Sequence, residues 1–369
     1  MAFTDPGLLR TKTHFHALDG LRGVAALCIV VFHFMEMIFT DYSLNFIGHG
    51  FLAVDFFFCL SGFVIGYAYD DRIGRIGLGE FFKSRLIRLH PLVLLGSVFG
   101  LVFFLYNPFG PDLGHYGVVN VTQLFVSSVL LIPYPLVEER GYALFALNSP
   151  SWSLFFEYVF NILYALFIVK LGRSALRAFT MIAAIALLAV AWRSGTLIGG
   201  WDGHTIVDGI ARISFSFLAG LLVFRSKLIL RSGIGFTGLS LILLLTFLMP
   251  YFSLNWLAES FVVILVYPLI IALGAGTQVE GATKKICIFL GRLSYPLYMT
   301  HIWAIWWFGD YIRLHKPTNM ELALIIAAGT LLLAGLGWLT MVLYDTPVRS
   351  YLGRKRVERS SPDPGVLLK

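Results

Sequence analysis

The chain has 369 residues, of which 58% are hydrophobic and 13% charged, and its mean hydropathy is +0.80. Soluble domains carry about 25% charged residues, so this composition excludes a soluble enzyme and indicates a protein that crosses a membrane several times. The net charge of +7 does not indicate nucleic-acid binding, because membrane proteins concentrate lysine and arginine on their cytoplasmic side. Cys28, Cys59 and Cys287 lie in apolar runs without the spacing of metal ligands, and we expect no metal site.

The first predicted membrane helix covers residues 18–40 and carries two ionisable side chains, Arg22 and His33. Their separation of eleven positions places them ~16 Å apart along a helix and ~20° apart around it, so they share one face. The simplest structural interpretation is an arginine that extends to the interface and a histidine satisfied by a neighbouring helix. Because ionisable groups inside a bilayer are costly and usually functional, we favour a functional pair.

Asp55 lies near the start of the second predicted span, residues 50–70. If the first two spans form an antiparallel hairpin, Asp55 and His33 lie at similar depths. A carboxylate beside an imidazole fixes its tautomer and stabilises its charged form. An aspartate that caps the helix or faces water explains the sequence equally well, so both interpretations stay open.

A basic segment after the second span contains Arg85 and Arg88, which are three positions apart and therefore neighbours on one helix surface. The simple interpretation is a flank of positive charge on the cytoplasmic side of the membrane. The pair is also suited to bind phosphate groups, because arginine makes bidentate hydrogen bonds to them.

The rest of the chain predicts eight further spans, at residues 91–106, 151–169, 176–192, 208–224, 234–249, 257–275, 288–310 and 320–344. The ambiguous part is the stretch rich in Pro and Gly at 107–150, with an apolar run at 118–136. If 118–136 does not cross, 22 of the 28 lysines and arginines face the cytoplasm and four face outward. We therefore expect an all-α, polytopic membrane helix bundle of about ten transmembrane helices, with 118–136 re-entrant or interfacial.

This topology places both termini in the cytoplasm. It divides the chain into a cytoplasmic N-terminal segment (1–16), a transmembrane domain (17–345) and a basic cytoplasmic tail (346–369). We expect no separate soluble domain, because the terminal segments are short.

Two later spans contain further polar groups. Glu157 lies about two turns into a span that also contains Trp152, and a carboxylate at that depth needs a cation, a hydrogen-bond donor or a proton. His301 follows Tyr295 and Tyr298 in a span that contains a proline, which frees backbone groups. A kinked helix with an inter-helix hydrogen bond explains His301 as well as a functional role does.

In their order, these groups resemble motifs of the integral-membrane acyltransferase-3 family. The matching segments span nearly the whole chain: Leu18 to Arg22 with His33 after ten further residues, Val54 to Phe58 with Ser61 to Phe63, Arg85 with Arg88, Trp152 to Leu154 with Glu157, Ser294 to Tyr298 ahead of His301, and Asp345 with Pro347. Two positions depart from the family pattern. Many members have a second glutamate at the position of Tyr158, and the last motif often has glutamate at the position of Asp345.

The resemblance implies an enzyme that moves an acyl group, most commonly acetyl, from acyl-coenzyme A to an alcohol. Members of the family O-acylate bacterial surface glycans, lipids and nodulation factors, which implies a multi-pass protein of the bacterial inner (plasma) membrane. The arginine–histidine motif of the family maps onto Arg22 and His33, and its paired arginines map onto Arg85 and Arg88. Acyl-coenzyme A is then a co-substrate, and no permanently bound cofactor is implied.

We therefore expect these three arginines to bind the donor from the cytoplasm. His33 is expected to act near the outer face as a general base or transient acyl carrier, oriented by Asp55 or Glu157. The residues expected at the acceptor site or in its structural support are Trp152, Tyr295, Tyr298 and His301. The acceptor classes open at this point are a lipopolysaccharide sugar, an exopolysaccharide precursor, a lipid and a small natural product.

The alternative function is a transporter or flippase for an anionic glycolipid, because intramembrane charges also suit a transport pathway. The absence of an internal sequence repeat weighs against it, since many transporters are built from repeats. In both interpretations the partners are the lipid bilayer and a glycan or glycolipid, and nucleic acid is not a partner.

Overall fold

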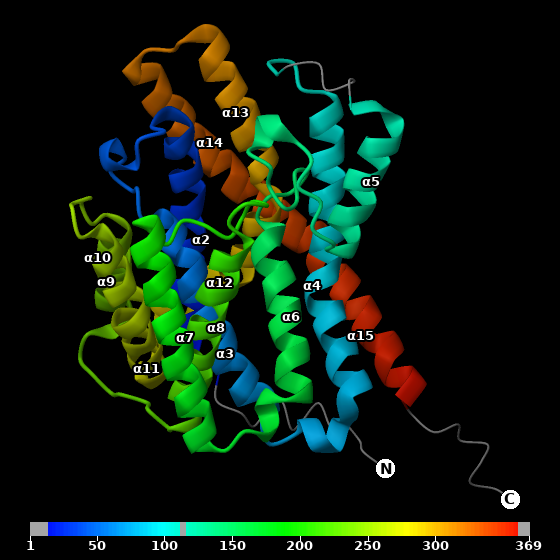
Figure 1. The fold of residues 1–369 in the computed structure, drawn as a ribbon. Helices are drawn as coiled ribbons and strands as arrows, with labels where there is room; N and C mark the ends of the chain where they lie inside the picture. Colours follow the sequence, from blue (N-terminus) through cyan, green and yellow to red (C-terminus); the bar gives the residue numbers. More distant parts are fainter. Residues whose placement is uncertain (1–13, 111–115, 361–369) are drawn as a thin grey trace, which may run out of the picture.

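The computed structural model describes residues 14–110 and 116–360, so most of the expected N-terminal segment and the end of the expected tail lie outside the described residues. The fold is all-α, as the sequence indicates, and the helices pack side by side as a bundle (Figure 1). The helices in chain order are α2 (His16–Ile38), α3 (Ala53–Tyr69), α4 (Ile73–Leu105), α5 (Gly117–Leu130), α6 (Ser151–Leu166), α7 (Arg173–Ser194), α8 (Ile206–Arg225), α9 (Gly235–Phe247), α10 (Asn255–Phe261), α11 (Tyr267–Gly276), α12 (Gly281–Thr300), α13 (Ile302–His315), α14 (Asn319–Thr340) and α15 (Thr346–Ser360).

Among the described residues, seven helical stretches are long and apolar enough to cross a bilayer. They are His16–Ile38, Gly50–Tyr69, Ile73–Leu105, Arg173–Ser194, Ile206–Arg225, Asn255–Gly276 and Asn319–Arg356, and each overlaps one predicted span. The predicted spans at 151–169 and 234–249 form the shorter helices α6 and α9. The total of ten spans and the cytoplasmic position of both termini remain predictions.

Two predicted boundaries were wrong. Helix α4 begins at Ile73 rather than residue 91, because the basic segment is itself helical and continues into the apolar part. The predicted single span 288–310 is broken at His301, which lies between α12 and α13. Pro296 lies inside α12, five residues before this break, and removes one backbone hydrogen bond within the helix.

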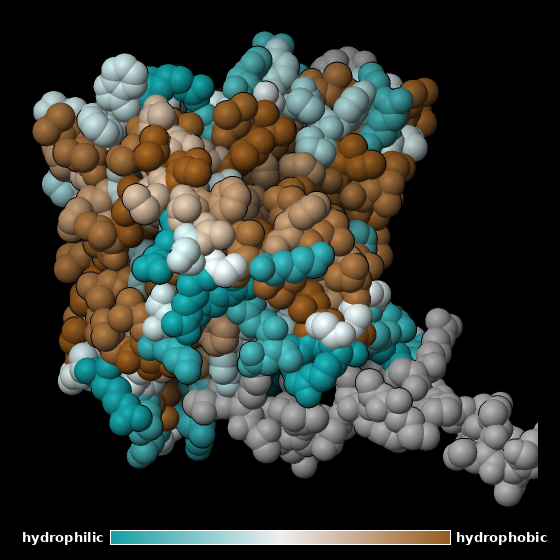
Figure 2. All heavy atoms as spheres, turned by 60° about the horizontal axis from the view of Figure 1, so that its bottom comes forward, coloured by the Kyte–Doolittle hydropathy of each residue, from teal (hydrophilic) through white to brown (hydrophobic). Residues whose placement is uncertain are grey.

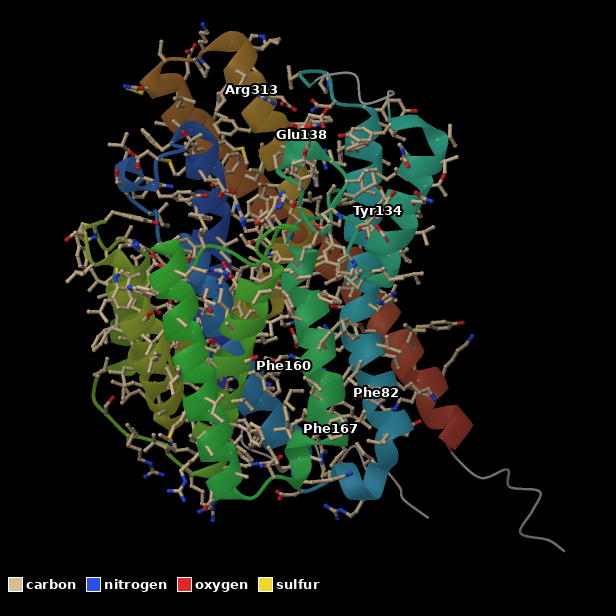
Figure 3. All side chains as sticks on the ribbon, viewed as in Figure 1. Phe82, Tyr134, Glu138, Phe160, Phe167 and Arg313 are labelled. Atoms are coloured by element: carbon tan, nitrogen blue, oxygen red, sulfur yellow. The ribbon has the colours of Figure 1, made fainter. Side chains whose placement is uncertain are left out.

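The stretch predicted not to cross the membrane contains α5, a helix of 14 residues that lies beside the upper part of α4 (Figure 1). Such a helix is about 21 Å long, which is shorter than the roughly 30 Å hydrocarbon core of a bilayer. In Figure 3 the chain after α5 passes Tyr134 and reaches Glu138 at the end of the molecule that also carries Arg313. The chain therefore turns back after α5 toward that end of the bundle. That 118–136 does not cross the membrane remains a prediction, because α9, a predicted span, is as short as α5.

Helices α2 and α12 pack unusually closely, and glycines make this approach possible. A Cβ at Gly23 would collide with Leu290, and a Cβ at Gly291 would collide with Asp19. Membrane helices use small residues in this way, because association in lipid depends on close packing rather than on the hydrophobic effect. The same principle applies to α3 and α8, where Gly62 packs against the backbone of Phe217. These contacts hold the helices that carry the polar groups at short range.

The last long helical stretch, Asn319–Arg356, is continuous through a π-helical turn at Met341–Asp345. A π-turn adds one residue to a helical turn and is frequently found at functional sites. The expected boundary between the transmembrane domain and the tail, at residue 345, therefore lies inside a continuous helix.

The surface agrees with a bundle that sits in a bilayer. Figure 2 shows hydrophobic side chains over the flank of the molecule and hydrophilic side chains gathered toward the end that faces the viewer. Lipid-facing positions of α7 are apolar and exposed, for example Ile182 and Ile185 at 62% and 66%. A polar band at one end and an apolar flank are the pattern that a membrane requires.

Candidate active site

Among the described helices, the side chain of Tyr298 lines two neighbouring cavities. The larger has a volume of about 800 Å³ and the smaller about 280 Å³. We call the larger one the arginine cavity, because its lining includes Arg22, Arg85, Arg88, Arg292 and Arg349. We call the smaller one the histidine cavity, because its lining includes His33. Arg22 and His33, predicted to share one face of the first helix, thus line different cavities.

Two of the three predicted donor-binding arginines are occupied by protein groups. Arg85 Nη2 donates to Glu157 Oε1 at 2.6 Å, and the same carboxylate oxygen accepts a hydrogen bond from Ser61. Arg22 donates to Ser294 Oγ at 2.9 Å and to the Gly291 carbonyl at 2.7 Å. These arginines therefore help to shape the cavity as well as to charge it.

Arg88 and Arg292 differ from these two arginines. Within the described part of the chain, neither makes a hydrogen bond or an ion pair, and both side chains have exposed surface at the arginine cavity. Arg349 is partly paired: its Nη1 donates to Asp345 Oδ2 at 2.9 Å, while 42% of its side chain is exposed. The five arginines share the cavity with three carboxylates, those of Asp19, Glu157 and Asp345, so the lining carries an excess of positive charge.

In the histidine cavity, the carboxylate partner of His33 is Glu36. His33 Nδ1 hydrogen-bonds Glu36 Oε1, and the other oxygen of Glu36 accepts a hydrogen bond from the Tyr42 hydroxyl at 3.3 Å. A carboxylate accepts, so Nδ1 carries the proton and Nε2 is left as the basic nitrogen. Sequence reasoning missed Glu36, although its position three residues after His33 on one helix was a usable signal.

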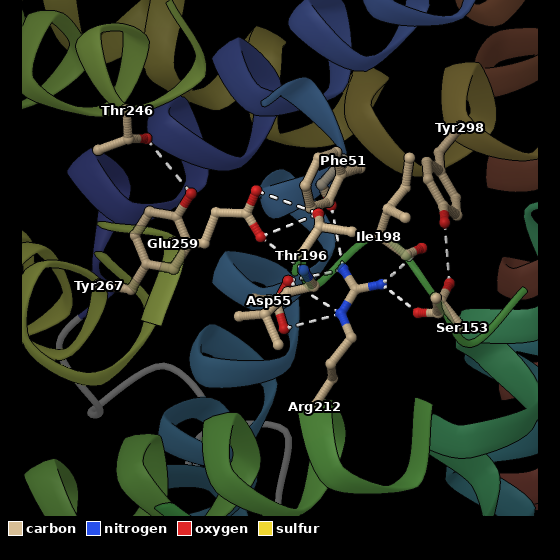
Figure 4. A network of polar contacts seen from close by, with 12 residues as sticks. Phe51, Asp55, Ser153, Thr196, Ile198, Arg212, Thr246, Glu259, Tyr267 and Tyr298 are labelled. Carbon is tan, nitrogen blue, oxygen red and sulfur yellow. Dashed lines mark hydrogen bonds and ion pairs between the residues drawn. The ribbon is translucent and has the colours of Figure 1, made fainter. Parts of the chain in front are cut away.

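The expected pairing of Asp55 or Glu157 with His33 was wrong. Asp55 is fully buried and its two oxygens accept hydrogen bonds from Arg212, the shortest of them 2.6 Å (Figure 4). Arg212 also donates to backbone carbonyls, including that of Gly199 at 2.7 Å. A buried carboxylate without a cation is very unfavourable, so Asp55 is held by the opposite charge within reach rather than by the histidine.

His301 lies directly against His33. Their rings are stacked with centroids 5.2 Å apart. His301 Nδ1 donates to the carbonyls of Leu297 and Tyr298 in the last turn of α12, and its buried Nε2 has no partner among the described residues. The break between α12 and α13 places this histidine beside His33. The expected kink is present, the hydrogen bonds of His301 within the described part of the chain go to α12 itself rather than to another helix, and a functional role for His301 remains a prediction.

The remaining predicted residues surround the boundary between the cavities. The Tyr298 hydroxyl is 2.9 Å from Ser153 Oγ (Figure 4). Trp152 lines the histidine cavity and packs against the Arg212 guanidinium, 5.2 Å from the ring centroid. Tyr295 lines the arginine cavity and donates to the Leu89 carbonyl at 2.6 Å. The histidine cavity is otherwise rich in aromatic side chains, including Trp201 and Trp306.

This arrangement places a group of arginines and a histidine–carboxylate pair in two cavities that share the side chain of Tyr298. Cationic cavities bind phosphate groups, and a histidine–carboxylate pair removes a proton from a hydroxyl group. An aromatic cavity suits a ligand with both apolar and hydroxyl-bearing surfaces. The geometry therefore fits the transfer of a group from an anionic carrier to an alcohol.

Comparison with known proteins identifies the reaction class. Residues 15–341 match the family model of an acyltransferase domain. The chain is 39% identical over 161 residues to "Protein 2 in picA locus" of Rhizobium radiobacter, a match that covers 41% of this chain and 81% of that protein. It is 25% identical over 387 residues to the acyltransferase MdmB of Streptomyces mycarofaciens, with 95% of both chains covered. No solved structure matches.

A further relative is the peptidoglycan O-acetyltransferase OatA of Listeria monocytogenes. The chain is 22% identical to it over 366 residues, which cover 92% of this chain and 56% of that protein. Because the family model covers most of the chain, and the helices form a multi-pass membrane bundle, the chain belongs to the acyltransferase-3 family of integral-membrane O-acyltransferases.

Proposed function

We propose that this acyltransferase moves an acyl group, with acetyl as the first candidate, from acyl-coenzyme A to a hydroxyl of a glycan or glycolipid. The observation that carries the proposal is the pairing of the arginine cavity with the histidine cavity across Tyr298. Two relatives named as peptidoglycan O-acetyltransferases, OatA and the putative enzyme YrhL of Bacillus subtilis, support acetyl as the group and a surface glycan as the acceptor.

The donor would enter from the cytoplasm and the acceptor from the outer side. In the predicted ten-span topology, the start of α2 is cytoplasmic, so Arg22 lies nearer the cytoplasm and His33 nearer the outer face. Coenzyme A carries a diphosphate and a 3′-phosphate, whose negative charge complements the excess of arginine over carboxylate in the arginine cavity. Its thioester would then lie near Tyr298, where the two cavities meet.

The proposed chemistry begins at Nε2 of His33. This nitrogen accepts the proton of the acceptor hydroxyl while the hydroxyl oxygen attacks the carbonyl carbon of the thioester. The carbon–sulfur bond breaks, and the coenzyme A thiolate leaves and takes the proton from the imidazolium. Glu36 stabilises the imidazolium through its hydrogen bond to Nδ1.

A variant of this mechanism forms a transient acyl-histidine before the acceptor reacts. It consumes the donor in the absence of acceptor and gives ping-pong kinetics, whereas direct transfer requires both substrates together. The alternative transporter function is disfavoured, because the chain belongs to a family of acyltransferases.

The proposal is tested with membranes that contain the wild-type protein or His33→Ala. We expect release of free coenzyme A thiol that depends on acceptor, a mass increase of one acyl group on the acceptor, and loss of at least about 10³-fold in His33→Ala. Surface glycans from strains with and without the gene, compared by mass spectrometry, identify the acceptor. Full activity in a folded His33→Ala protein, or movement of a glycolipid without covalent change, would contradict the proposal.

A further inference from the structure

Arg292 lies on α12 at the arginine cavity and was not among the residues that the sequence indicated for the donor. Its side chain is exposed at the cavity and has no hydrogen-bond or ion-pair partner in the described part of the chain. Arg88, on α4, is likewise exposed at the cavity and has no hydrogen-bond or ion-pair partner among the described residues. Two exposed guanidinium groups without protein partners at one cavity leave their hydrogen-bond donors and their positive charge available, which favours the binding of an anion.

Arg349, on α15, completes a group of three arginines from three different helices. Its partner Asp345 belongs to the π-helical turn and lines the same cavity. The Oδ2 atom of Asp345 bonds Arg349, whereas its buried Oδ1 has no partner among the described residues. This carboxylate therefore satisfies part of one arginine and leaves Arg88 and Arg292 available.

We propose that Arg292, together with Arg88 and Arg349, binds the phosphate groups of the donor and thereby selects a nucleotide thioester over a simple thioester. This inference rests on the proposed function, because it assigns residues to the donor of that reaction. Arginine suits the role, since its planar guanidinium bonds two phosphate oxygens at once and keeps its charge in an apolar environment. Arg85 is not in this group, because its side chain is only 5% exposed and is paired with Glu157, whereas the side chain of Arg349 is 42% exposed beside its pairing with Asp345.

The phosphate-bearing molecule at these arginines has two conceivable sources, the soluble donor and an anionic lipid headgroup. The two are distinguished by removing phosphates from the donor one at a time. The series is acetyl-coenzyme A, acetyl-3′-dephospho-coenzyme A, acetyl-4′-phosphopantetheine and acetylpantetheine. If an arginine binds a donor phosphate, its substitution lowers kcat/KM only for donors that carry that phosphate. If it binds a lipid headgroup, its substitution lowers kcat/KM equally for all four donors.

The experiment measures kcat/KM for this series with the full-length wild-type protein and Arg292→Gln. We expect Arg292→Gln to lower kcat/KM by about 10- to 100-fold with acetyl-coenzyme A, the loss expected for a charged hydrogen bond. With acetylpantetheine it should equal the wild type. Arg292→Lys should retain part of the activity, and Arg231→Gln, an exposed arginine outside the cavity, should change nothing.

Two results would overturn the inference: an unchanged kcat/KM with acetyl-coenzyme A, or an equal loss with all four donors. Stimulation of the wild type by phosphatidylglycerol vesicles that Arg292→Gln lacks, with an equal loss for all donors, would assign the arginine to a lipid headgroup. Equilibrium binding of coenzyme A, measured by calorimetry, separates this inference from the proposed function. Arg292-dependent binding without acyl transfer would retain the inference and contradict the proposed function.

Discussion

Arginines line both cavities, but they differ in their hydrogen-bond partners. Arg212 lines the histidine cavity and donates to Asp55 and to the carbonyls of Phe51 and Gly199, with only 1% of its side chain exposed. Arg88 and Arg292 line the arginine cavity without a partner in the described residues. The residue type is the same in both cavities, whereas the supply of hydrogen-bond acceptors from the protein differs.

The difference separates charges that hold the fold from charges that are available for a ligand. Around Arg212 the chain provides an acceptor for each N–H group of the guanidinium. Nearby, Glu259 accepts hydrogen bonds from Thr196 and from the backbone N–H of Leu197 (Figure 4). A satisfied buried ion pair fixes the positions of helices but binds nothing further. An intramembrane charge is therefore informative about function only when its partners are known.

Of the substitutions that test this comparison, Asp55→Asn should have the largest effect, which is a loss of stability. It leaves the buried Arg212 guanidinium without its counter-charge, and removal of one partner of a buried ion pair costs about 3–5 kcal/mol. We expect the unfolding temperature in detergent to be strongly lowered. It is measured by fluorescence, or by size-exclusion chromatography after heating.

The matched control is Arg292→Gln, which also removes one charge at a cavity. Because Arg292 has no protein partner, its loss should leave the unfolding temperature unchanged. If Asp55→Asn is as stable as the wild type, or if Arg292→Gln is destabilised to the same extent, the distinction between the two arginine environments fails.

Glu36→Gln should produce a smaller effect, on the reaction rate rather than on stability. The amide cannot stabilise the imidazolium of His33 as a carboxylate does, and we expect kcat to fall about 10²-fold, equivalent to ~2.7 kcal/mol. The KM for acyl-coenzyme A should not change, because Glu36 lines only the histidine cavity. Glu157→Gln is the informative contrast, since Glu157 bonds Arg85 and lines only the arginine cavity. An equal loss of kcat with no change in KM in both variants would contradict the assignment of Glu36.

The helical fold and most of its spans follow from hydropathy, because a membrane helix must be long and apolar. The positions at which helices begin and break do not follow from hydropathy. The break at His301 lies within one long apolar run, and the helical state of the basic segment before residue 91 has no apolar signal. Charge counting predicts that 118–136 does not cross, and this stays a prediction, because the length of α5 does not distinguish it from α9, which is predicted to cross.

Residue type and depth led to the proposal of His33, Arg88 and Tyr298 as site residues, and the structure places them at the two cavities. Their functional roles remain predictions, whereas several of the expected pairings differ from the structure. Pairings depend on which helices are neighbours, and the sequence contains no measure of that proximity. The partner of Asp55 lies 157 positions away, whereas Glu36, the partner of His33, was near enough to be recognised from helical spacing.

The central claim is that the arginine cavity receives the donor on the cytoplasmic side while the base acts toward the outer side. It is tested most directly by supplying acyl-coenzyme A to one face of sealed vesicles. Inside-out vesicles should release coenzyme A thiol when the donor is added outside them, and right-side-out vesicles should do so only after permeabilisation. Equal use of the donor in both orientations, or use in right-side-out vesicles alone, would contradict the account.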